Sequence, residues 1–305
     1  MSVKLVNDET FTLEDLRSWD RPGIWLAVLG HPIKHSLSPH MHNAALEELA
    51  KSDASYEQWQ YTRFDIPVEN LEEALGLLHE KRFRGVNLTI PHKVEALKYV
   101  ADMDPDAAAI GAINTLFWKD SGYYGYNTDG YGVETAIARN LNVSLLDKPV
   151  VLLGAGGAGR AAAVQCLSRD CQALWIGNRS SARLDALVQD IRKLYPKAEI
   201  YPFLFESDPQ LPESALIINA TSTGLKAEDR LPMDMSGFAP DSVFFDMIYN
   251  PPETIMMRAL KAQGVAACNG LDMLVYQGAR ALEIWTGRDQ VPEKAMRSAA
   301  LGGKS

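Results

Sequence analysis

Residues 148–167, KPVVLLGAGGAGRAAAVQCL, decide the fold class of the second half of the chain. A short apolar run leads into GAGGAG, and an alanine-rich stretch with helical spacing follows. A G-x-G-x-x-G turn between a strand and a helix is typical of dinucleotide-binding βαβ units. Gly154 permits the tight bend, Gly156 lets the backbone approach a pyrophosphate, and Gly159 allows the helix to pack closely on the strand. The stretch therefore predicts a Rossmann-type domain, with a tight turn that binds no ligand as the alternative.

The strand after this turn indicates which dinucleotide is bound. An NAD site places an acidic residue about 20 positions further on, where it accepts a hydrogen bond from the ribose 2′-hydroxyl. Here the predicted strand at 173–178 ends in NRSSAR, without a carboxylate. The guanidinium groups of Arg179 and Arg183 suit a 2′-phosphate, because arginine can bind phosphate through two parallel hydrogen bonds. NADP is therefore expected, and ordinary surface arginines are the alternative interpretation.

Strand and helix patterns alternate along the rest of the chain, which is typical of an α/β protein with mostly parallel sheets. Predicted strands lie at 24–30, 55–64, 85–90, 111–118, 123–128, 150–153, 173–178, 199–205, 215–222, 242–249 and 265–270; predicted helices include 38–52, 68–82, 91–100, 131–141 and 271–287. At 305 residues the chain exceeds the usual size of one domain. We expect a first domain over 1–127, completed by C-terminal helices at 271–305, and a Rossmann-type domain over 128–270.

The composition excludes several classes of partner. Lysine and arginine number 30 and aspartate and glutamate 39, a formal net charge of −9, whereas nucleic acids and anionic membranes require a basic surface. The three cysteines form no CxxC pair and no even set, which indicates reduced thiols. The N-terminus is unlike a signal or transit peptide, and no apolar run approaches the roughly 18 residues of a membrane span. We expect a soluble cytoplasmic protein.

Four of the six histidines lie within HPIKHSLSPHMH at 31–42, so a metal site has to be considered. His40 and His42 are two positions apart on the predicted helix and point to different faces, whereas paired ligands need a spacing of four. No carboxylate or cysteine nearby completes a ligand set. No metal is expected.

Two serines in the same stretch allow two interpretations. Ser38 can be the N-cap of the helix, with Pro39 at the first helical position. Alternatively, the hydroxyls of Ser36 and Ser38 and the helix N–H groups can bind an anion such as a substrate carboxylate.

GVNLTIPHK at 85–93 has the pattern of a strand that ends at Pro91 and enters a helix at Lys93. A cation at a helix N-terminus is unfavourable by roughly 0.3–1 kcal/mol, so we expect a functional role for Lys93.

Polar residues also lie near the ends of successive predicted strands, where open α/β sheets bind ligands: Asn87, Thr89, Asn114 and Asp129. Each of these can equally be a local hydrogen-bond partner or cap. Together, Lys93 and Asp129 can supply a proton donor and a carboxylate that orients it.

Nine motifs occur in the order SLSPHMHNAAL, GVNLTIPHK, GAINTL, YNTDG, GAGGAG, NRSSAR, INATSTG, FDMIYNPPET and GLDMLVYQGA. With this set, which runs from about residue 24 to 290, the chain resembles the shikimate dehydrogenase family. The resemblance implies a substrate domain, formed by the N-terminal half and the last helices, and a Rossmann-type domain, with a cleft between them. It also implies reversible, NADPH-dependent reduction of 3-dehydroshikimate to shikimate, a step in the biosynthesis of chorismate and the aromatic amino acids, without a metal.

The resemblance implies a role for individual residues. Ser36 and Ser38 would hold the substrate carboxylate, and Lys93 and Asp129 would form the catalytic pair. The ring hydroxyls would be bound by Asn87, Thr89, Asn114, Asp129 and Gln277, with Tyr249 close to substrate and nicotinamide. The cofactor would be held at its pyrophosphate by Gly154, Ala155, Gly156, Gly157 and Ala158, at the adenosine phosphate by Asn178, Arg179, Ser180 and Arg183, and at the nicotinamide half by Thr221, Met247 and Gly270.

Three features depart from the family pattern. The segment before Ile24 is longer than the family core needs, and we assign it no role. Residue 37 is leucine where some members carry a basic residue, and residue 159 is glycine where many carry serine.

Two other functions stay open. A quinate/shikimate dehydrogenase of broader specificity would differ in pocket shape and in its hydrogen bonds to one more hydroxyl. A non-catalytic, ligand-sensing regulator could share the fold, although the presence of both Lys93 and Asp129 favours an enzyme. The expected partner is a small-molecule substrate, without nucleic acid or membrane, and a homodimer is left open.

Overall fold

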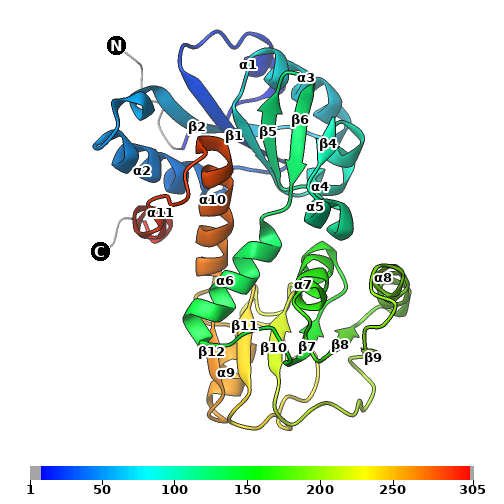
Figure 1. Ribbon diagram of the computed structural model, residues 1–305. Coiled ribbons are helices and arrows are strands. Elements are labelled where there is room, and N and C mark those ends of the chain that lie inside the picture. Colours follow the sequence, from blue (N-terminus) through cyan, green and yellow to red (C-terminus); the bar gives the residue numbers. More distant parts are fainter. Residues whose placement is uncertain (1–7, 303–305) are drawn as a thin grey trace. The chain divides into compact units, whose positions relative to one another are not determined.

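The computed structural model describes residues 8–302, and the chain divides into two compact units (Figure 1). The first unit contains Met1–Thr128 and Val275–Ser305, and the second contains Asp129–Leu274. Residues 1–7 and 303–305, which the sequence analysis places at the ends of the first domain, lie outside the described residues.

A six-stranded mixed sheet forms the centre of the first unit, in the strand order β2-β1-β3-β5-β6-β4. The strands are β1 Ile24–Gly30, β2 Trp59–Asp65, β3 Gly85–Leu88, β4 Asp102–Met103, β5 Thr115–Lys119 and β6 Gly122–Tyr126. β1 pairs in parallel with β2 and β3, whereas β5 runs antiparallel to β3 and β6. Because β1 and β3 end at the same edge, the segments that follow them, with Ser36 and Thr89, start side by side.

The helices of the first unit are α1 Leu13–Arg17, α2 Ser38–Ala50, α3 Leu71–Glu80, α4 His92–Glu95, α5 Pro105–Ile110 and α11 Glu293–Ala300, with 3₁₀ turns η1 Ala54–Gln58, η2 Val68–Asn70 and η3 Ala96–Lys98. α10, Leu271–Thr286, begins in the second unit and ends in the first. Its last turn is anchored by the fully buried Trp285, whose indole N–H donates to the carbonyl of Leu116 at 2.9 Å. α11 packs against α2.

The N-terminal segment is part of the core of the first unit. Phe11 forms a parallel bridge with Phe64 on β2, so the segment extends the sheet at its edge strand. The rings of Phe11 and Trp19 meet edge to face at 5.1 Å, and both side chains are buried. They join Trp25, Phe64 and Phe83 in one apolar cluster, so the segment before Ile24 contributes to stability.

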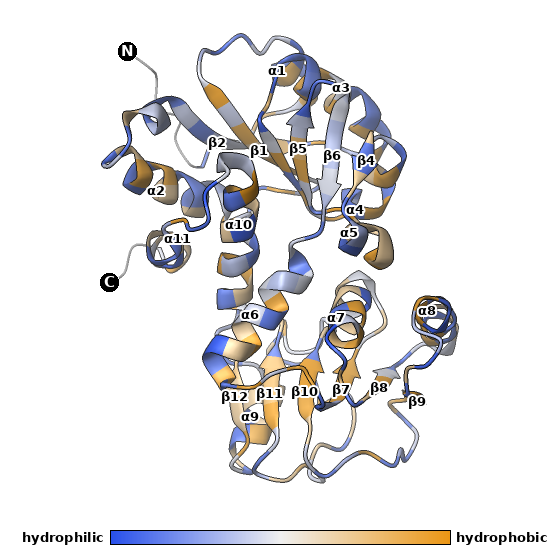
Figure 2. Ribbon diagram, viewed as in Figure 1, coloured by the Kyte–Doolittle hydropathy of each residue, from blue (hydrophilic) through white to orange (hydrophobic). Residues whose placement is uncertain are grey.

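The second unit is built on an all-parallel sheet in the order β12-β11-β10-β7-β8-β9. Its strands are β7 Pro149–Leu153, β8 Ala173–Asn178, β9 Ile200–Leu204, β10 Leu216–Asn219, β11 Val243–Asp246 and β12 Ala266–Cys268, and its helices are α6 Asp129–Leu141, α7 Gly157–Ser168, α8 Ser181–Leu194 and α9 Ile255–Lys261. β7 and β10 are apolar and buried along nearly their whole length (Figure 2), as expected of a sheet covered on both faces. With β7 counted first, this is the strand order of dinucleotide-binding domains, which confirms the predicted Rossmann-type fold.

Some predicted elements differ from the structure. The strand predicted over 55–64 begins only at Trp59, because the Asp53 side chain accepts a hydrogen bond from the Ser55 N–H at 3.0 Å and starts η1. The strand predicted over 111–118 begins only at Thr115, because Gly111 ends α5 in a left-handed conformation. α1, β4 and α5 are not predicted, and α11 lies within the C-terminal helices predicted at 271–305 without separate bounds. Across residues 8–302, no helix is both long and apolar enough to cross a membrane.

Candidate active site

The loop after β1 and the start of α2 carry the two serines predicted to bind a carboxylate. α2 begins at Ser38, and its N-cap is Leu37, which has no side chain that can cap. The prediction that Ser38 is the N-cap is therefore wrong. Ser36 supplies the capping oxygen instead, since its hydroxyl accepts a hydrogen bond from the Ser38 N–H at 3.3 Å. The Ser38 side chain is buried and interacts with the Tyr61 hydroxyl, where it opposes the rise in the pKa of Tyr61 that burial causes.

Tyr61 on β2 connects this loop to Asn87 on β3. The Tyr61 hydroxyl donates to Asn87 Oδ1 at 2.7 Å, in a fully buried environment. Asn87 Nδ2 in turn donates to the carbonyl of Asn114 at 3.1 Å and to the hydroxyl of Thr115 at 3.0 Å. These three partners fix which way the Asn87 amide faces.

Asn114 continues the network towards α10. Its Oδ1 accepts hydrogen bonds from the Thr128 N–H at 2.8 Å and the Thr115 hydroxyl at 3.0 Å. Its Nδ2 donates to the Thr128 hydroxyl at 3.0 Å and to Gln277 Oε1 at 3.4 Å. One buried network thus joins three residues predicted to bind ring hydroxyls, which are Asn87, Asn114 and Gln277.

Thr89 and Lys93 follow β3. The Thr89 N–H donates to the carbonyl of Leu29 at 2.9 Å, which holds Thr89 at the carboxyl end of β1. Lys93 is the half-buried second residue of α4. Because α4 has only 4 residues, its macrodipole is weak, and the unfavourable electrostatics predicted for Lys93 is small. Asp129 is the first residue of α6 and belongs to the second unit, so the pairing of Lys93 with Asp129 stays a prediction.

His42 supports the network from α2. Its ring is fully buried and stacks on Tyr61, with ring centroids 4.2 Å apart and an interplanar angle of 3°. Burial lowers the pKa of His42 to about 3, so the ring is neutral near pH 7 and gives Tyr61 a flat, uncharged support. Within residues 8–302, no group of three or more histidine, cysteine, aspartate or glutamate side chains is placed to hold a metal ion.

In the second unit, the glycine-rich turn lies between β7 and α7. Gly154 has a φ of +113°, a conformation that a side chain would strain. A Cβ on Gly159 would lie 2.0 Å from the carbonyl oxygen of Gly154, so only glycine lets α7 start this close to β7. At Gly156 and Gly157 a Cβ would meet nothing within 4 Å. The turn therefore leaves open space at the N-terminus of α7, where a dinucleotide pyrophosphate fits.

The end of β8 lies beside the glycine-rich turn. Asn178 Oδ1 accepts a hydrogen bond from the Ala155 N–H at 3.3 Å, and Asn178 Nδ2 donates to the carbonyl of Ser180 at 2.9 Å. Ser180 is the N-cap of α8. The exposed Arg183, in the first turn of α8, lines a pocket of about 500 Å³ that is also lined by Ala155, Gly156 and Gly157. Arg179 is exposed at the same loop.

The loops after β10 and β11 carry further residues predicted to bind the cofactor or substrate. Thr221 is held by Asn219, whose Oδ1 accepts from the Thr221 hydroxyl at 2.7 Å. The buried Asp246 accepts hydrogen bonds from Asn219 Nδ2 at 2.8 Å and from the Thr254 hydroxyl at 2.6 Å. Asp246 thereby closes the loop from 247 to 253, which carries Met247 and Tyr249.

Backbone hydrogen bonds hold the remaining residues of this region. The Met247 N–H donates to the carbonyl of Asn219 at 3.0 Å, and the Gly270 N–H donates to the carbonyl of Ile248 at 3.1 Å. Burial raises the pKa of Tyr249, so its hydroxyl stays protonated at neutral pH and can donate a hydrogen bond.

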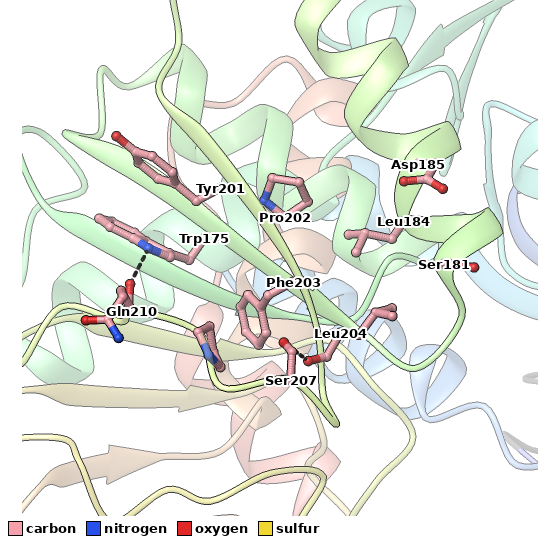
Figure 3. A pocket seen from close by; sticks show the side chains of 11 residues that line it. Trp175, Ser181, Leu184, Asp185, Tyr201, Pro202, Phe203, Leu204, Ser207 and Gln210 are labelled. Atoms are coloured by element: carbon pink, nitrogen blue, oxygen red, sulfur yellow. Dashed lines mark hydrogen bonds between the residues drawn. The ribbon is translucent and has the colours of Figure 1, made fainter.

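A second pocket in this unit, of about 540 Å³, lies beside β8, β9 and the start of α8 (Figure 3). Trp175 and Tyr201 stack there with centroids 4.9 Å apart, and the Trp175 indole N–H donates to the carbonyl of Gln210 at 3.1 Å. None of the residues that line it is among those predicted to bind substrate or cofactor. We therefore do not assign it to the active site.

Sequence reasoning missed the residues that hold these side chains in place: Tyr61, Thr115, Thr128, Asn219, Asp246 and Thr254. A signal existed for some of them. Tyr61 lies two positions before Arg63 on β2, so two polar-tipped side chains share one face of a strand that is otherwise largely apolar. The motif FDMIYNPPET also contains both partners of the Asp246–Thr254 hydrogen bond.

The fold and the site define an α/β oxidoreductase that binds a nicotinamide dinucleotide. Shikimate dehydrogenase (NADP(+)) of Methanococcus aeolicus is 37% identical over 264 residues, which cover 86% of this chain and 91% of that protein. The enzyme of the same name from Symbiobacterium thermophilum is 38% identical over 285 residues, with 92% and 94% covered. The chain belongs to the shikimate dehydrogenase family.

Family models and solved structures agree with this assignment. Residues 28–116 match the shikimate dehydrogenase substrate binding domain, and residues 270–301 match the shikimate 5′-dehydrogenase C-terminal domain. Shikimate 5-dehydrogenase of Thermus thermophilus, in complex with NADP(H) and shikimate, has a TM-score of 0.79 and 34% identity, covering 92% of this chain and 99% of that one.

Enzymes named for other substrates share the fold. 5-Ketofructose reductase of Gluconobacter sp. has a TM-score of 0.83 at 28% identity, with 92% of this chain and 99% of that one covered. Quinate dehydrogenase of Corynebacterium glutamicum, in complex with NAD, has a TM-score of 0.80 at 26% identity, with the same coverage of 92% and 99%. Since the fold is common to all three activities, substrate choice depends on the site.

Proposed function

We propose that this chain catalyses the reversible, NADP-dependent interconversion of 3-dehydroshikimate and shikimate. The observation that carries the proposal is the hydrogen-bond network of the first unit, which joins Asn87, Asn114 and Gln277 and supports their assignment as polar groups for a hydroxylated ring. Its sequence relatives, at 37% and 38% identity over most of the chain, bear the name of this activity.

Most of the proposed substrate residues belong to the first unit, Asp129 and Tyr249 belong to the second, and all the proposed cofactor residues belong to the second. Ser36 and Ser38 bind the substrate carboxylate, while the ring hydroxyls are bound by Asn87, Thr89, Asn114, Asp129 and Gln277. The pyrophosphate lies on the turn from Gly154 to Ala158, and Arg179 and Arg183 bind the 2′-phosphate beside Asn178 and Ser180. The nicotinamide half is lined by Thr221, Met247 and Gly270, and Tyr249 binds the substrate close to the nicotinamide. The open space beside Gly156 supports the cofactor assignment.

Side chains of this protein transfer the proton to and from the substrate oxygen. When bound, NADPH supplies the hydride that reduces the ketone carbon of 3-dehydroshikimate. Lys93 donates a proton to the ketone oxygen as negative charge develops there, and in the oxidation direction it removes the proton from the hydroxyl. Asp129 is the proposed carboxylate partner that orients the Lys93 side chain.

A cytoplasmic location, which the sequence favours, is also part of the proposal. The sequence leaves open whether the protein forms a homodimer. Light scattering on the purified protein measures the mass directly, and a mass of one chain at all concentrations would rule out the dimer.

Variants of the two catalytic residues test the proposal. Lys93→Ala should lower kcat about 10²–10⁴-fold, the usual contribution of general acid–base catalysis, while NADP binding and thermal unfolding change little. The double variant Lys93→Ala/Asp129→Ala should lose much less than the product of the two single losses, because the residues act as a unit. Near-normal turnover by Lys93→Ala would remove this lysine from the mechanism.

A further inference from the structure

Arg63 is a buried cation that contacts the loop carrying the two serines. It lies on β2 and is 2% exposed. Its Nη1 donates to the carbonyl of Ser36 at 3.1 Å, its Nε to the hydroxyl of Thr10 at 2.8 Å, and its Nη2 to the carbonyl of Asp8. All three acceptors are uncharged, so they satisfy the guanidinium without neutralising it.

The charge of Arg63 is only weakly compensated. Among the described residues, the one carboxylate within ion-pair distance is that of Asp8, 3.9 Å from Nη2. The Asp8 side chain is 79% exposed, so solvent screens its effect. Burial lowers the pKa of Arg63, but an arginine side chain stays protonated in proteins. A buried charge without a buried counter-ion costs stability, which points to a role in binding an anion.

The two serines need such a charge. Their hydroxyls can donate hydrogen bonds to a carboxylate, but they carry no charge to replace the hydration that the carboxylate loses. We infer that Arg63 supplies the counter-charge for the substrate carboxylate and makes the site select acidic polyols over neutral ones. Arg63 acts through the Ser36 peptide, as a positioning and specificity residue that does not touch the substrate. This inference rests on the proposed function, because it takes Ser36 and Ser38 as the carboxylate site.

The N-terminal segment holds the guanidinium in place. Asp8 and Thr10 provide two of its three acceptors. The Phe11 N–H donates to the carbonyl of Arg63 at 3.0 Å, and the Asp65 N–H donates to the carbonyl of Phe11 at 2.8 Å, so the segment is bonded to β2 on both sides of the arginine. Residues 8–11 thereby gain a function, since they hold Arg63 in place beside the carbonyl of Ser36.

The test compares an acid with its neutral ester. The value of kcat/KM for oxidation with NADP is measured for shikimate and for shikimate methyl ester, in the wild type and in Arg63→Gln. We expect Arg63→Gln to lower kcat/KM about tenfold for the acid, which corresponds to about 1.4 kcal/mol, and to change it little for the ester. The acid-to-ester preference should therefore fall by about the same factor.

Arg84→Gln is the matched control. Arg84 also lies in the first unit and donates to a backbone carbonyl, that of Trp285, at 3.2 Å, and it lies over the Phe117 ring at 4.6 Å. It has no contact with the serine loop among the described residues. Arg84→Gln should lower the stability of the protein and leave the acid-to-ester preference unchanged.

The outcomes separate the inference from the proposed function. A wild type that oxidises neither shikimate nor its ester contradicts the proposed function. A wild type that is active, with equal losses for acid and ester in Arg63→Gln, contradicts the inference alone. If Arg63→Gln does not fold, Arg63→Lys decides. Arg63→Lys keeps the charge and should keep most of the preference, and Asp8→Asn should change it little, because solvent already screens the Asp8 carboxylate. Loss of the preference in folded Arg63→Lys would overturn the inference.

Discussion

Tyr61 shows how a side chain can set the geometry of a binding site by holding its neighbours. Tyr61→Phe removes the hydroxyl but keeps the ring stacked on His42. Asn87 Oδ1 then loses its buried donor, while Nδ2 keeps its two acceptors, and the unpaired buried oxygen costs about 1–3 kcal/mol. We expect KM for shikimate to rise roughly tenfold, with KM for NADP unchanged.

Tyr123→Phe is the control for this prediction. Tyr123 is a buried tyrosine of the same unit, and its hydroxyl donates to the carbonyl of Phe83 at 2.9 Å, away from the network. This variant should lose stability without a change in KM for shikimate. A Tyr61→Phe enzyme that loses stability but keeps its KM would show that the hydroxyl has only a structural role.

Arg179 and Arg183 carry the prediction on cofactor choice. Changing both to alanine should raise KM for NADP sharply and leave KM for NAD nearly unchanged, because only NADP presents a 2′-phosphate. Steady-state kinetics with both cofactors measures this directly. Equal losses for the two cofactors would mean that these arginines do not bind the 2′-phosphate.

At this scale the sequence singles out candidate site residues, but not the residues that hold them in place. Lysine, asparagine and serine near strand ends stand out by type and position. Tyr61 lies on β2 and Asn87 on β3, however, and β1 lies between these two strands. Only the strand order shows that the Tyr61 side chain reaches Asn87 across β1. The same holds for Arg63, since two of its three acceptors, at Asp8 and Thr10, lie on an N-terminal segment that no motif covers.

At the scale of elements, the start of α2 changes what the serine variants should do. Because the Ser36 hydroxyl caps the helix, Ser36→Ala should lower stability by about 1 kcal/mol and also weaken substrate binding. Ser38 has no capping role, so Ser38→Ala should raise the Kd for shikimate with a smaller change in melting temperature. Thermal unfolding and shikimate titration of both variants would check this. The opposite ranking of melting temperatures would restore Ser38 as the cap.

The sequence predicts best the bounds of elements that have a long and clear apolar pattern. β1 and β8 have the predicted bounds, since each is a continuous apolar run closed by a turn signal. α1 and β4 have only 5 and 2 residues, and too short a pattern to recognise. α1 depends on the Thr12 capping box, and β4 on pairing with β6, which no local propensity encodes.

At the scale of the whole molecule, the chain forms two units, and each unit is built on its own six-stranded sheet. The Rossmann-type unit is predictable because GAGGAG, its flanking strand and its helix are contiguous in sequence. The first unit draws on both ends of the chain, and its mixed sheet, with β5 antiparallel, has no comparable local signature. Its architecture could be anticipated only through the resemblance to a family.

The central claim is that the enzyme reduces 3-dehydroshikimate with NADPH. The most direct test is one set of steady-state measurements on the purified protein, with 3-dehydroshikimate and 5-ketofructose in reduction and shikimate and quinate in oxidation, each with the NADP and the NAD form of the cofactor. The account predicts the highest kcat/KM for shikimate in oxidation and for 3-dehydroshikimate in reduction, in both cases with the NADP form. A higher kcat/KM for quinate with NAD, or for 5-ketofructose, would contradict it.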